Sequence, residues 1–305
     1  MQQESIDLIA FMKRFQTEEQ CREVLYRLRW PNGIVCPKCS STRHYKVKSR
    51  HLYHCAQCQY QISATANTIF HKSQVPLVKW FAAIFLMAHD KRGVSGAKLS
   101  RDIGVSYPTA WLMLHKLRKA MSDRDSEYML SRIVEVDDAY FGAPDDEGHR
   151  GRGTDKTPAV IALQVDETGR PEYLKMCVVE NLKSETVTGA IAGMVTRGSE
   201  IRTDGLFSYR KLAEHEYTVK QEKFNLDSNP EHLFWLHKIV SNVKAFIAGT
   251  YHGLDKKHLQ RYFDEFTYRF NRRKRPEELF MRLLQAGASA KPITWKQIVY
   301  GLETV

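Results

Sequence analysis

Two groups of residues have the types and the spacing that metal chemistry requires. The first is a set of two CxxC pairs, "CPKC" at Cys36 and Cys39 and "CAQC" at Cys55 and Cys58, separated by fifteen residues. Each pair can give two thiolates to one tetrahedral Zn²⁺, and four protein ligands leave no open position for catalysis. The spacing therefore predicts a structural zinc ribbon. A redox dithiol is disfavoured because no thioredoxin-like βαβ pattern surrounds the pairs.

The second group consists of Asp137, Asp204 and His237. Asp137 follows the alternating stretch "SRIVEV", and Asp204 ends the short stretch "SEIRTD". Two carboxylates that meet at strand ends need cations to offset their repulsion. Two Mg²⁺ ions ~3.5–4 Å apart can clamp the attacking and leaving oxygens of a phosphodiester. A histidine nitrogen in the third place can ligate a divalent metal and adds no negative charge, so the group predicts metal-dependent phosphodiester chemistry.

His237 lies in a predicted amphipathic helix, "LFWLHKIVSNVKAFIAGTYHG". Asn229 followed by Pro230 is a possible start for this helix, and Gly249 is its expected end. Its apolar stripe recurs at steps of three and four and contains Leu233, Leu236, Val240, Val243 and Ile247. Lys244 points the same way as His237, about 10 Å along the axis. The alternative is that His237 only packs at the edge of the stripe and Lys244 is a solvated charge.

The elements that must position these residues follow from residue 131 onward. Period-two and helical patterns alternate there in the order three strands, helix, strand, helix, strand, helix. This is the order of a ribonuclease H-like α/β domain, a mixed sheet with helices on its faces. In that order Asp137 and Asp204 end neighbouring strands, and His237 reaches them from a helix across the strand ends.

Between the cysteines and the predicted sheet, the sequence favours a helix-turn-helix unit. A short helix over residues 95–102, a turn at Gly104 and a second helix over residues 106–121 match that pattern. Any three-helix bundle can give a similar pattern, so DNA binding by this unit is a hypothesis. The residues expected to face a DNA groove are Tyr107, Thr109 and Lys116.

Composition indicates a polyanionic partner. The 305 residues carry a formal net charge of +11 and a pI of about 9.3, which suits nucleic acid. The segment between the two CxxC pairs holds several basic residues and no acid, and Lys46 and Lys48 are expected to contact DNA. We find no stretch of about 18 apolar residues and no signal peptide, so no membrane association is expected. The protein is expected to be cytoplasmic and associated with the nucleoid.

Taken together, these stretches resemble the insertion-sequence transposases that join an N-terminal zinc ribbon to a DDE-type catalytic domain, the ISXO-like group. The resemblance covers nearly the whole chain and rests on "CREVLYRLRWPNGIVCPKC", "VEVDDAYFG", "HRGRG", "TDG" and "GTYHGLDKKHLQRYFDEFTYRFNRR". By this resemblance, Asp137 and Asp204 match the two catalytic aspartates. His237 matches the variable third ligand and Lys244 the lysine that follows it, a DDH/K variant. Asp138 stands where glutamate is usual, and of these two neighbours we assign the metal to Asp137.

The resemblance implies a DNA transposase. Such an enzyme binds the terminal inverted repeats of its element, nicks the ends with Mg²⁺ or Mn²⁺, and joins the freed 3′-OH to target DNA. Its partners are double-stranded DNA at the element ends and target, bound by a homo-oligomer. Further expected contacts to the DNA backbone are Arg150, Arg152, Lys256, Lys257, Arg272 and Arg273. Two alternatives stay open: a DNA-binding regulator with an inactive C-terminal half, and a ribonuclease H-like nuclease without strand transfer.

The predicted fold class is therefore multi-domain α+β. Residues 1–68 are expected to form an N-terminal helix and the Cys₄ zinc ribbon, and residues 69–128 the helix-turn-helix unit. Residues 129–275 are expected to form the catalytic domain, and residues 276–305 a C-terminal helical segment.

Overall fold

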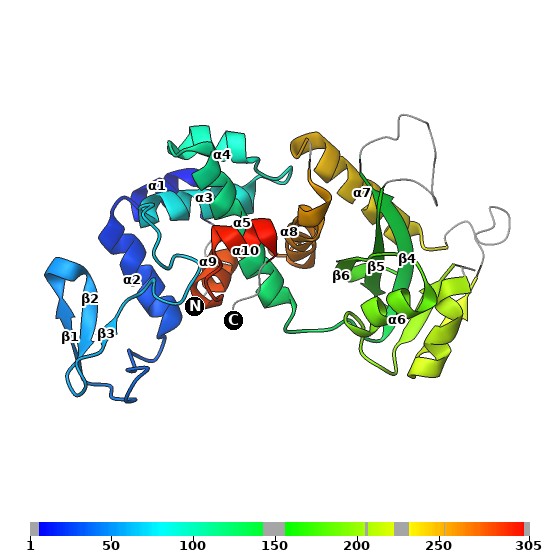
Figure 1. Ribbon diagram of the computed structural model, residues 1–305, viewed down its shortest axis with the longest axis horizontal. Coiled ribbons are helices and arrows are strands. Elements are labelled where there is room, and N and C mark those ends of the chain that lie inside the picture. The colour runs from blue at the N-terminus through cyan, green and yellow to red at the C-terminus, as the bar shows by residue number, and fades with distance from the viewer. Residues whose placement is uncertain (1–5, 143–155, 205–206, 223–231, 253, 302–305) are drawn as a thin grey trace. The chain divides into compact units, whose positions relative to one another are not determined.

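The computed structural model describes residues 6–142, 156–204, 207–222, 232–252 and 254–301. The chain divides into two compact units (Figure 1). The first contains both ends of the chain, Met1–Arg124 and Arg275–Val305, and the second is the central stretch Asp125–Lys274. Among the described helices, none is long and apolar enough to cross a bilayer.

The first unit is mainly helical. Its helices are α1 (Leu8–Arg14), α2 (Glu18–Arg29), α3 (Leu77–His89), α4 (Gly96–Ile103), α5 (Tyr107–Asp125, whose last residue begins the second unit), α9 (Leu279–Ser289) and α10 (Trp295–Tyr300), with short 3₁₀ helices at Lys48–Arg50 and Pro276–Glu278. Thr17 caps α2 in a capping box with Gln20, which satisfies backbone donors at that helix end. The predicted helix pair on either side of Gly104 is confirmed, although α5 runs beyond residue 121.

The C-terminal helix α9 completes the core of this unit. The ring of Phe280 lies 5.5 Å from that of Phe11 on α1, and Phe11 stacks on Phe85 of α3 at 4.4 Å. At Gly287 the chain approaches so closely that an added Cβ would lie 2.9 Å from the side chain of Ile69. The last helices of the chain therefore pack with the first ones.

A small antiparallel sheet carries the CxxC pairs. Its strands are β1 (His44–Val47), β2 (Leu52–Cys55) and β3 (Gln61–Ile62), in that order. Helix α2 covers it, because the ring of Tyr26 packs edge-on against Tyr53 at 4.8 Å and Arg29 donates to the carbonyls of Ser63 and Ala64.

The second unit is a mixed α/β layer structure. Its strands are β4 (Ile133–Phe141), β5 (Thr157–Val165), β6 (Pro171–Val178), β7 (Glu200–Thr203) and β8 (Thr218–Gln221), and its helices are α6 (Ser184–Ala192), α7 (Phe234–Thr250) and α8 (Leu259–Asn271), with 3₁₀ helices at Phe207–His215 and Lys256–His258. The sheet order is β6-β5-β4-β7-β8, with β5 antiparallel to β4 and β6, and β7 parallel to β4 and β8. Numbered along the unit this is 3-2-1-4-5, which confirms the predicted ribonuclease H-like order.

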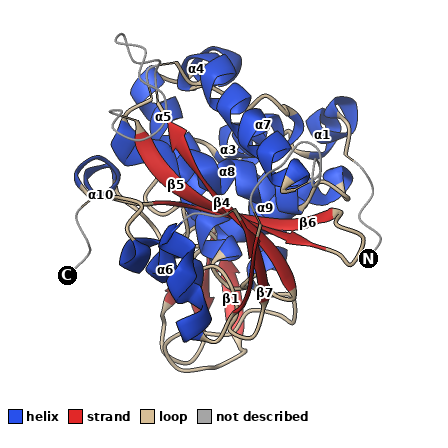
Figure 2. Ribbon diagram, turned by 90° about the vertical axis from the view of Figure 1, so that its right-hand side faces the viewer, coloured by secondary structure: helices blue, strands red, loops and turns tan. Residues whose placement is uncertain are grey.

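Alternation along β4 separates the two faces of this sheet. Val134 and Val136 point to a core shared with α6, while Ala139 and Phe141 point to a core shared with α7 and α8. The twisted strands, red in Figure 2, thus have α6 on one face and α7 with α8 on the other. Odd-numbered positions of β4, including residues 135 and 137, face α7.

Helix α7 starts later than predicted. It begins at Phe234 after Leu233, which has a left-handed backbone (φ 51°), and it continues past Gly249 to Thr250. The predicted start at Asn229 and Pro230 lies outside the described residues. The predicted stripe is confirmed, since Leu233, Leu236, Val243 and their partly buried neighbours pack in the core under α7.

Candidate active site and zinc ribbon

Strands β4 and β7 are neighbours in the sheet and bring Asp137 and Asp204 to the same level. Asp204 directly follows β7 as predicted, but the prediction that Asp137 ends its strand is wrong, because β4 continues to Phe141. In their parallel pairing, Glu135 lies opposite Arg202 and Val136 opposite Thr203. The next positions along the two strands are Asp137 and Asp204. Opposed residues in parallel strands project to the same face, so both aspartates lie on the face that α7 covers.

Helix α7 brings His237 to this pair. Its Nε2 lies 3.3 Å from Oδ2 of Asp137, and the two side chains are 51% and 17% exposed. The hydrogen bond to Asp137 raises the pKa of His237 above its usual value, although partial burial opposes this. The negative charges of Asp137, Glu135 and Asp204 add to the increase. All three carboxylates are therefore within electrostatic reach of this imidazole.

Asp138 points to the opposite face of β4 and is held there by a hydrogen bond. The hydroxyl of Tyr209, a buried residue of the 3₁₀ helix after Asp204, donates to Oδ1 of Asp138 at 3.2 Å. The backbone amide of Asp138 donates in turn to Oδ1 of Asp137 at 2.8 Å. Burial and the nearby aspartates raise the pKa of Tyr209 well above its usual value, so its phenol stays protonated. Of the two neighbouring acids, Asp137 is the one that faces His237.

Lys244 lies farther along the same helix. It is exposed, and its Nζ is 5.8 Å from the centroid of the Phe141 ring at the end of β4. A cation at this distance from an aromatic face is weakly attracted to it. The contact holds an ammonium beside the strand that carries Asp137.

Glu135 is an acidic residue of this face that the sequence analysis missed. It is 9% exposed, and its Oε2 has no hydrogen-bond partner among the described residues. Burial raises the pKa of its carboxyl to about 7, against the opposing charges of Arg202 and His237. The signal was present in "IVEVDD", because strand alternation places Glu135 on the same side as Asp137.

The donor set fits a divalent cation, since carboxylate oxygens and imidazole suit Mg²⁺ and Mn²⁺. The geometry is nevertheless open. In the described parts of the chain, the four cysteines are the one group of three or more His, Cys, Asp or Glu residues whose ligand atoms all lie within 4.8 Å of one another. Asp137, Asp204 and His237 are less closely gathered, so a bound ion has to draw their side chains together.

The zinc-ribbon cysteines are already in place. Sγ of Cys36 lies 3.6 Å from that of Cys58, and Sγ of Cys39 lies 3.5 Å from that of Cys55. Zn–S bonds of about 2.3 Å in a tetrahedron require sulfur atoms about 3.8 Å apart, close to these values. The Cys58 amide helps hold the pKa of the Cys55 thiol at about 6, which favours the thiolate that a metal binds.

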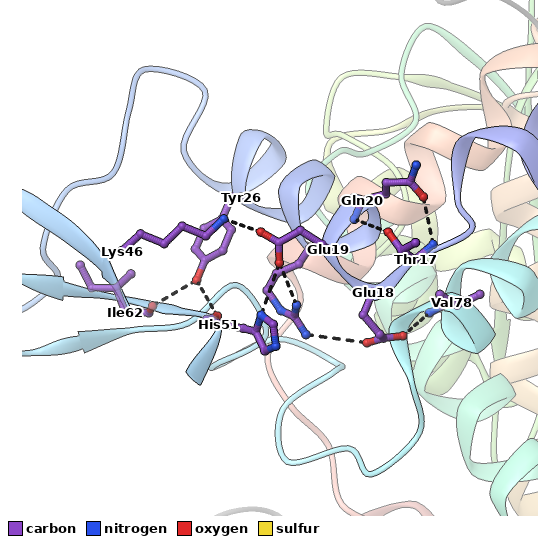
Figure 3. Close-up of polar contacts among 10 residues, drawn as sticks. Thr17, Glu18, Glu19, Gln20, Tyr26, Lys46, His51, Ile62 and Val78 are labelled. Carbon is purple, nitrogen blue, oxygen red and sulfur yellow. Dashed lines mark hydrogen bonds and ion pairs between the residues drawn. The ribbon is translucent and has the colours of Figure 1, made fainter. Parts of the chain in front are cut away.

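Lys46, one of the two expected DNA contacts in the ribbon, is paired within the protein. Figure 3 shows Glu19 of α2 reaching Lys46 and His51 of the ribbon, with Nδ1 of His51 3.4 Å from Oε2 of Glu19. Glu19 also contacts Arg22 at 3.4 Å. This carboxylate therefore ties the ribbon to α2. The side chain of Lys48 lies outside the described part of the structure.

The predicted groove-facing residues of α5 divide into two groups. Tyr107 is 54% exposed, and Thr109 is half-buried with its hydroxyl 2.8 Å from Oγ of Ser106. The prediction for Lys116 is wrong, because it is 8% exposed and its ammonium donates to the carbonyl of Ile69 at 3.2 Å. Burial also lowers its pKa. Lys116 links α5 to the segment that follows the ribbon.

The prediction for Arg272 is also wrong. Its guanidinium lies 2.7 Å from Asp125 and 3.5 Å from the centroid of the Tyr268 ring, and its side chain is 9% exposed. Arg273 is more exposed, but its guanidinium donates to the carbonyls of Glu172 and Phe270. Both arginines hold the second unit together.

The structure describes only some of the other residues that are expected to contact DNA. Lys256 and Lys257 are exposed, and Lys257 lies 3.2 Å from Asp255. Arg150 and Arg152 lie outside the described residues.

Two protein families match the sequence. The ISXO2-like transposase domain matches residues 129–271, and the transposase zinc-ribbon domain matches residues 16–61. A protein described as an uncharacterised protein in transposable element ISH50 of Halobacterium salinarum is 27% identical over 230 residues. That alignment covers 69% of this chain and 75% of the relative.

Solved structures give distant matches. One is a chain of the simian T-cell lymphotropic virus intasome in complex with PP2A regulatory subunit B56 gamma, with 12% identity and a TM-score of 0.29. That match covers 59% of this chain and 66% of the other. Another is the Mos1 strand transfer complex, with 14% identity and a TM-score of 0.26 over 70% of this chain and 78% of the other.

Proposed function

The chain belongs to the ISXO2-like insertion-sequence transposases, and from this premise we propose that it nicks the ends of its element and transfers the 3′-OH strand to target DNA. The observation that carries the proposal is the placement of Asp137 and Asp204 on one face of adjacent parallel strands, with His237 3.3 Å from Asp137. Two acids on adjacent strands and an imidazole on the facing helix form a donor set suited to metal-dependent phosphodiester cleavage.

In this proposal Asp137, Asp204 and His237 hold Mg²⁺ or Mn²⁺. Bound ions stabilise the charge that develops on the attacking and leaving oxygens of the phosphodiester. His237 must present a neutral ring, so its Nε2 has to lose the proton that it shares with Asp137. The amide of Asp138 orients Asp137, the hydroxyl of Tyr209 holds the side chain of Asp138, and Lys244 binds a phosphate near the scissile bond.

We assign the binding of the element ends to the first unit. The closely gathered cysteines support a structural Zn²⁺ in the ribbon. The exposed Tyr107 at the start of α5, within the predicted unit of residues 69–128, is the best-placed groove contact of the helix pair. A net charge of +11 supports further contacts to the DNA backbone and assembly of more than one copy on DNA.

The test is a nicking assay on double-stranded oligonucleotides that carry the ends of the element, with Mg²⁺ or Mn²⁺. Asp204→Ala should lower the nicking rate at least about a thousandfold, the scale expected when electrostatic stabilisation of a transition state is lost. DNA affinity should remain, since removal of a carboxylate does not weaken the approach of a polyanion. Nicking by folded Asp204→Ala protein near the wild-type rate would place the active site elsewhere.

A further inference from the structure

We infer that Glu135 is a further metal ligand of the active site and supplies the third carboxylate that His237 lacks. The inference rests on the proposed function and concerns the same face of the sheet. Glu135 belongs neither to the two CxxC pairs nor to the group of Asp137, Asp204 and His237.

The position of Glu135 follows from the strand pairing. Glu135 and Asp137 are two residues apart on β4, so both side chains face α7. Their Cα atoms are about 6.8 Å apart along the strand, and the longer side chain of glutamate gives its carboxylate the reach to share a cation with Asp137. Glu135 lies opposite Arg202 of β7. It is therefore one same-face position before Asp137 and Asp204 along the two strands.

One carboxylate oxygen of Glu135 is buried without a hydrogen bond to any described residue, although Arg202 and His237 act on its charge from a distance. The residue is 9% exposed, and its Oε2 has no hydrogen-bond partner within the described ranges. The cation that faces it on β7, Arg202, directs its Nε to Glu200 at 2.8 Å. Buried carboxylates are normally paired or bound to a metal, because the charge is costly to remove from water. A free oxygen on the metal-binding face is therefore an available ligand.

The charge of the site supports the same conclusion. Asp137, Asp204 and a neutral His237 provide two negative charges for divalent cations. Glu135 raises this number to three, the charge of a site with three carboxylates. His237 and Glu135 together then replace one carboxylate ligand. The imidazole supplies a ligand atom, and Glu135 supplies the negative charge. A glutamate at position 237 should make Glu135 dispensable.

If Glu135 has only a structural role, the expected effect on metal binding is different. If the residue only fills space below α7, its isosteric replacement by glutamine leaves the metal affinity unchanged. The two roles can therefore be separated by metal binding, with no measurement of catalysis.

The experiment measures Mn²⁺ binding to the full-length, zinc-loaded protein by electron paramagnetic resonance of the free ion. Glu135→Gln should weaken binding at least about tenfold, the lower end of the losses seen when groups that support a metal site are removed. The double variant Glu135→Gln, His237→Glu should return to within about threefold of wild type. The matched control is Glu185→Gln, the same change at an exposed residue of α6 that pairs with Lys211. It should bind Mn²⁺ like wild type.

The variant Asp137→Asn distinguishes a failure of the Glu135 inference from a failure of the proposed metal-dependent active site. If wild type binds Mn²⁺, Asp137→Asn does not, and Glu135→Gln binds as tightly as wild type, the inference is overturned while the proposed active site stands. A double variant that stays as weak as Glu135→Gln would refute the compensation between the two residues. Absence of Mn²⁺ binding by wild type would overturn both the inference and the metal-dependent function.

Discussion

The zinc ribbon and the candidate active site both carry residues that suit a metal ion, but their side chains are gathered to different degrees. In the ribbon, four thiols from two local turns lie close together, with sulfur atoms 3.5–3.6 Å apart across the two pairs. In the candidate active site, the side chains come from β4, β7 and α7, with Nε2 of His237 3.3 Å from Oδ2 of Asp137. A site made of neighbouring residues is fixed by its turns, whereas a site made of distant residues depends on tertiary packing and charge balance.

Loss of zinc should give the largest effect and should affect the ribbon alone. Cys36→Ser removes one of four ligands, and zinc binding in comparable small domains contributes about 10 kcal/mol of folding free energy. We expect the ribbon to unfold and DNA binding to weaken, while the second unit stays folded. Zinc content, together with hydrogen exchange of the amides in β1, β2 and β4, measures both results. Full DNA affinity in this variant would contradict the expectation.

Loss of His237 should abolish the chemistry and leave the ribbon intact. Removal of a metal ligand should slow nicking about a thousandfold, which corresponds to about 4 kcal/mol in the barrier. His237→Glu should regain part of the activity with Mg²⁺, because carboxylate oxygens suit that ion. Nicking rates of the two variants with Mg²⁺ and Mn²⁺ are the measurement. Wild-type rates in folded His237→Ala protein would mean that His237 only packs beside α7.

The charge balance of the candidate active site should appear as a pH dependence of stability without added Mg²⁺ or Mn²⁺. The folded protein raises the pKa of Glu135 from 4.5 to about 7, so between these values it binds more protons than the unfolded chain. The free energy of unfolding should therefore fall as pH rises through this window, by about 3 kcal/mol.

Glu135→Gln should remove this pH dependence. Hydrogen exchange of the β4 and β5 amides should show equal protection of variant and wild type near pH 4.5, and greater protection of the variant at pH 8. Equal protection of the two proteins at both pH values would argue against a buried charge at Glu135.

The link between α2 and the ribbon should give the smallest effect. Glu19→Gln breaks the ion pair with Lys46, and both side chains are about a third or more exposed, so the stability loss should be below about 1 kcal/mol. The freed ammonium can reach a phosphate, so DNA affinity should rise about twofold to threefold at low salt and show a steeper salt dependence. Salt titrations of DNA binding by the variant, with Glu23→Gln on the same helix as the control, measure this. A loss of affinity would show that Glu19 is needed to orient the ribbon.

Most of the predictions that the structure confirms rest on local sequence patterns. The cysteine spacing predicted the ribbon, and strand alternation predicted a sheet whose order makes the strands of Asp137 and Asp204 neighbours, although β4 continues past Asp137 to Phe141. Lys116 and Arg272 were misjudged because their partners are distant in sequence, a carbonyl at Ile69 and a carboxylate at Asp125. A basic residue looks the same in a sequence whether it meets a phosphate or a buried carbonyl.

Glu135 shows the opposite limit. Its place on the α7 face could be predicted from alternation, but its burial and unpaired oxygen depend on α7 and β7 packing around it. The residues of α7 and β7 that surround Glu135 are distant from it in sequence, so the sequence alone could not show this burial.

The packing of α9 against α1 and α3 has a consequence for synthesis on the ribosome. Phe280 contributes to a core that begins with Phe11, so the first unit cannot be completed until the whole central unit has been translated. A chain that stops before α9 exposes Phe11 and Phe85 to water and is open to aggregation or proteolysis. Messages with premature stop codons should therefore fail to yield stable DNA-binding fragments that compete with the full-length enzyme.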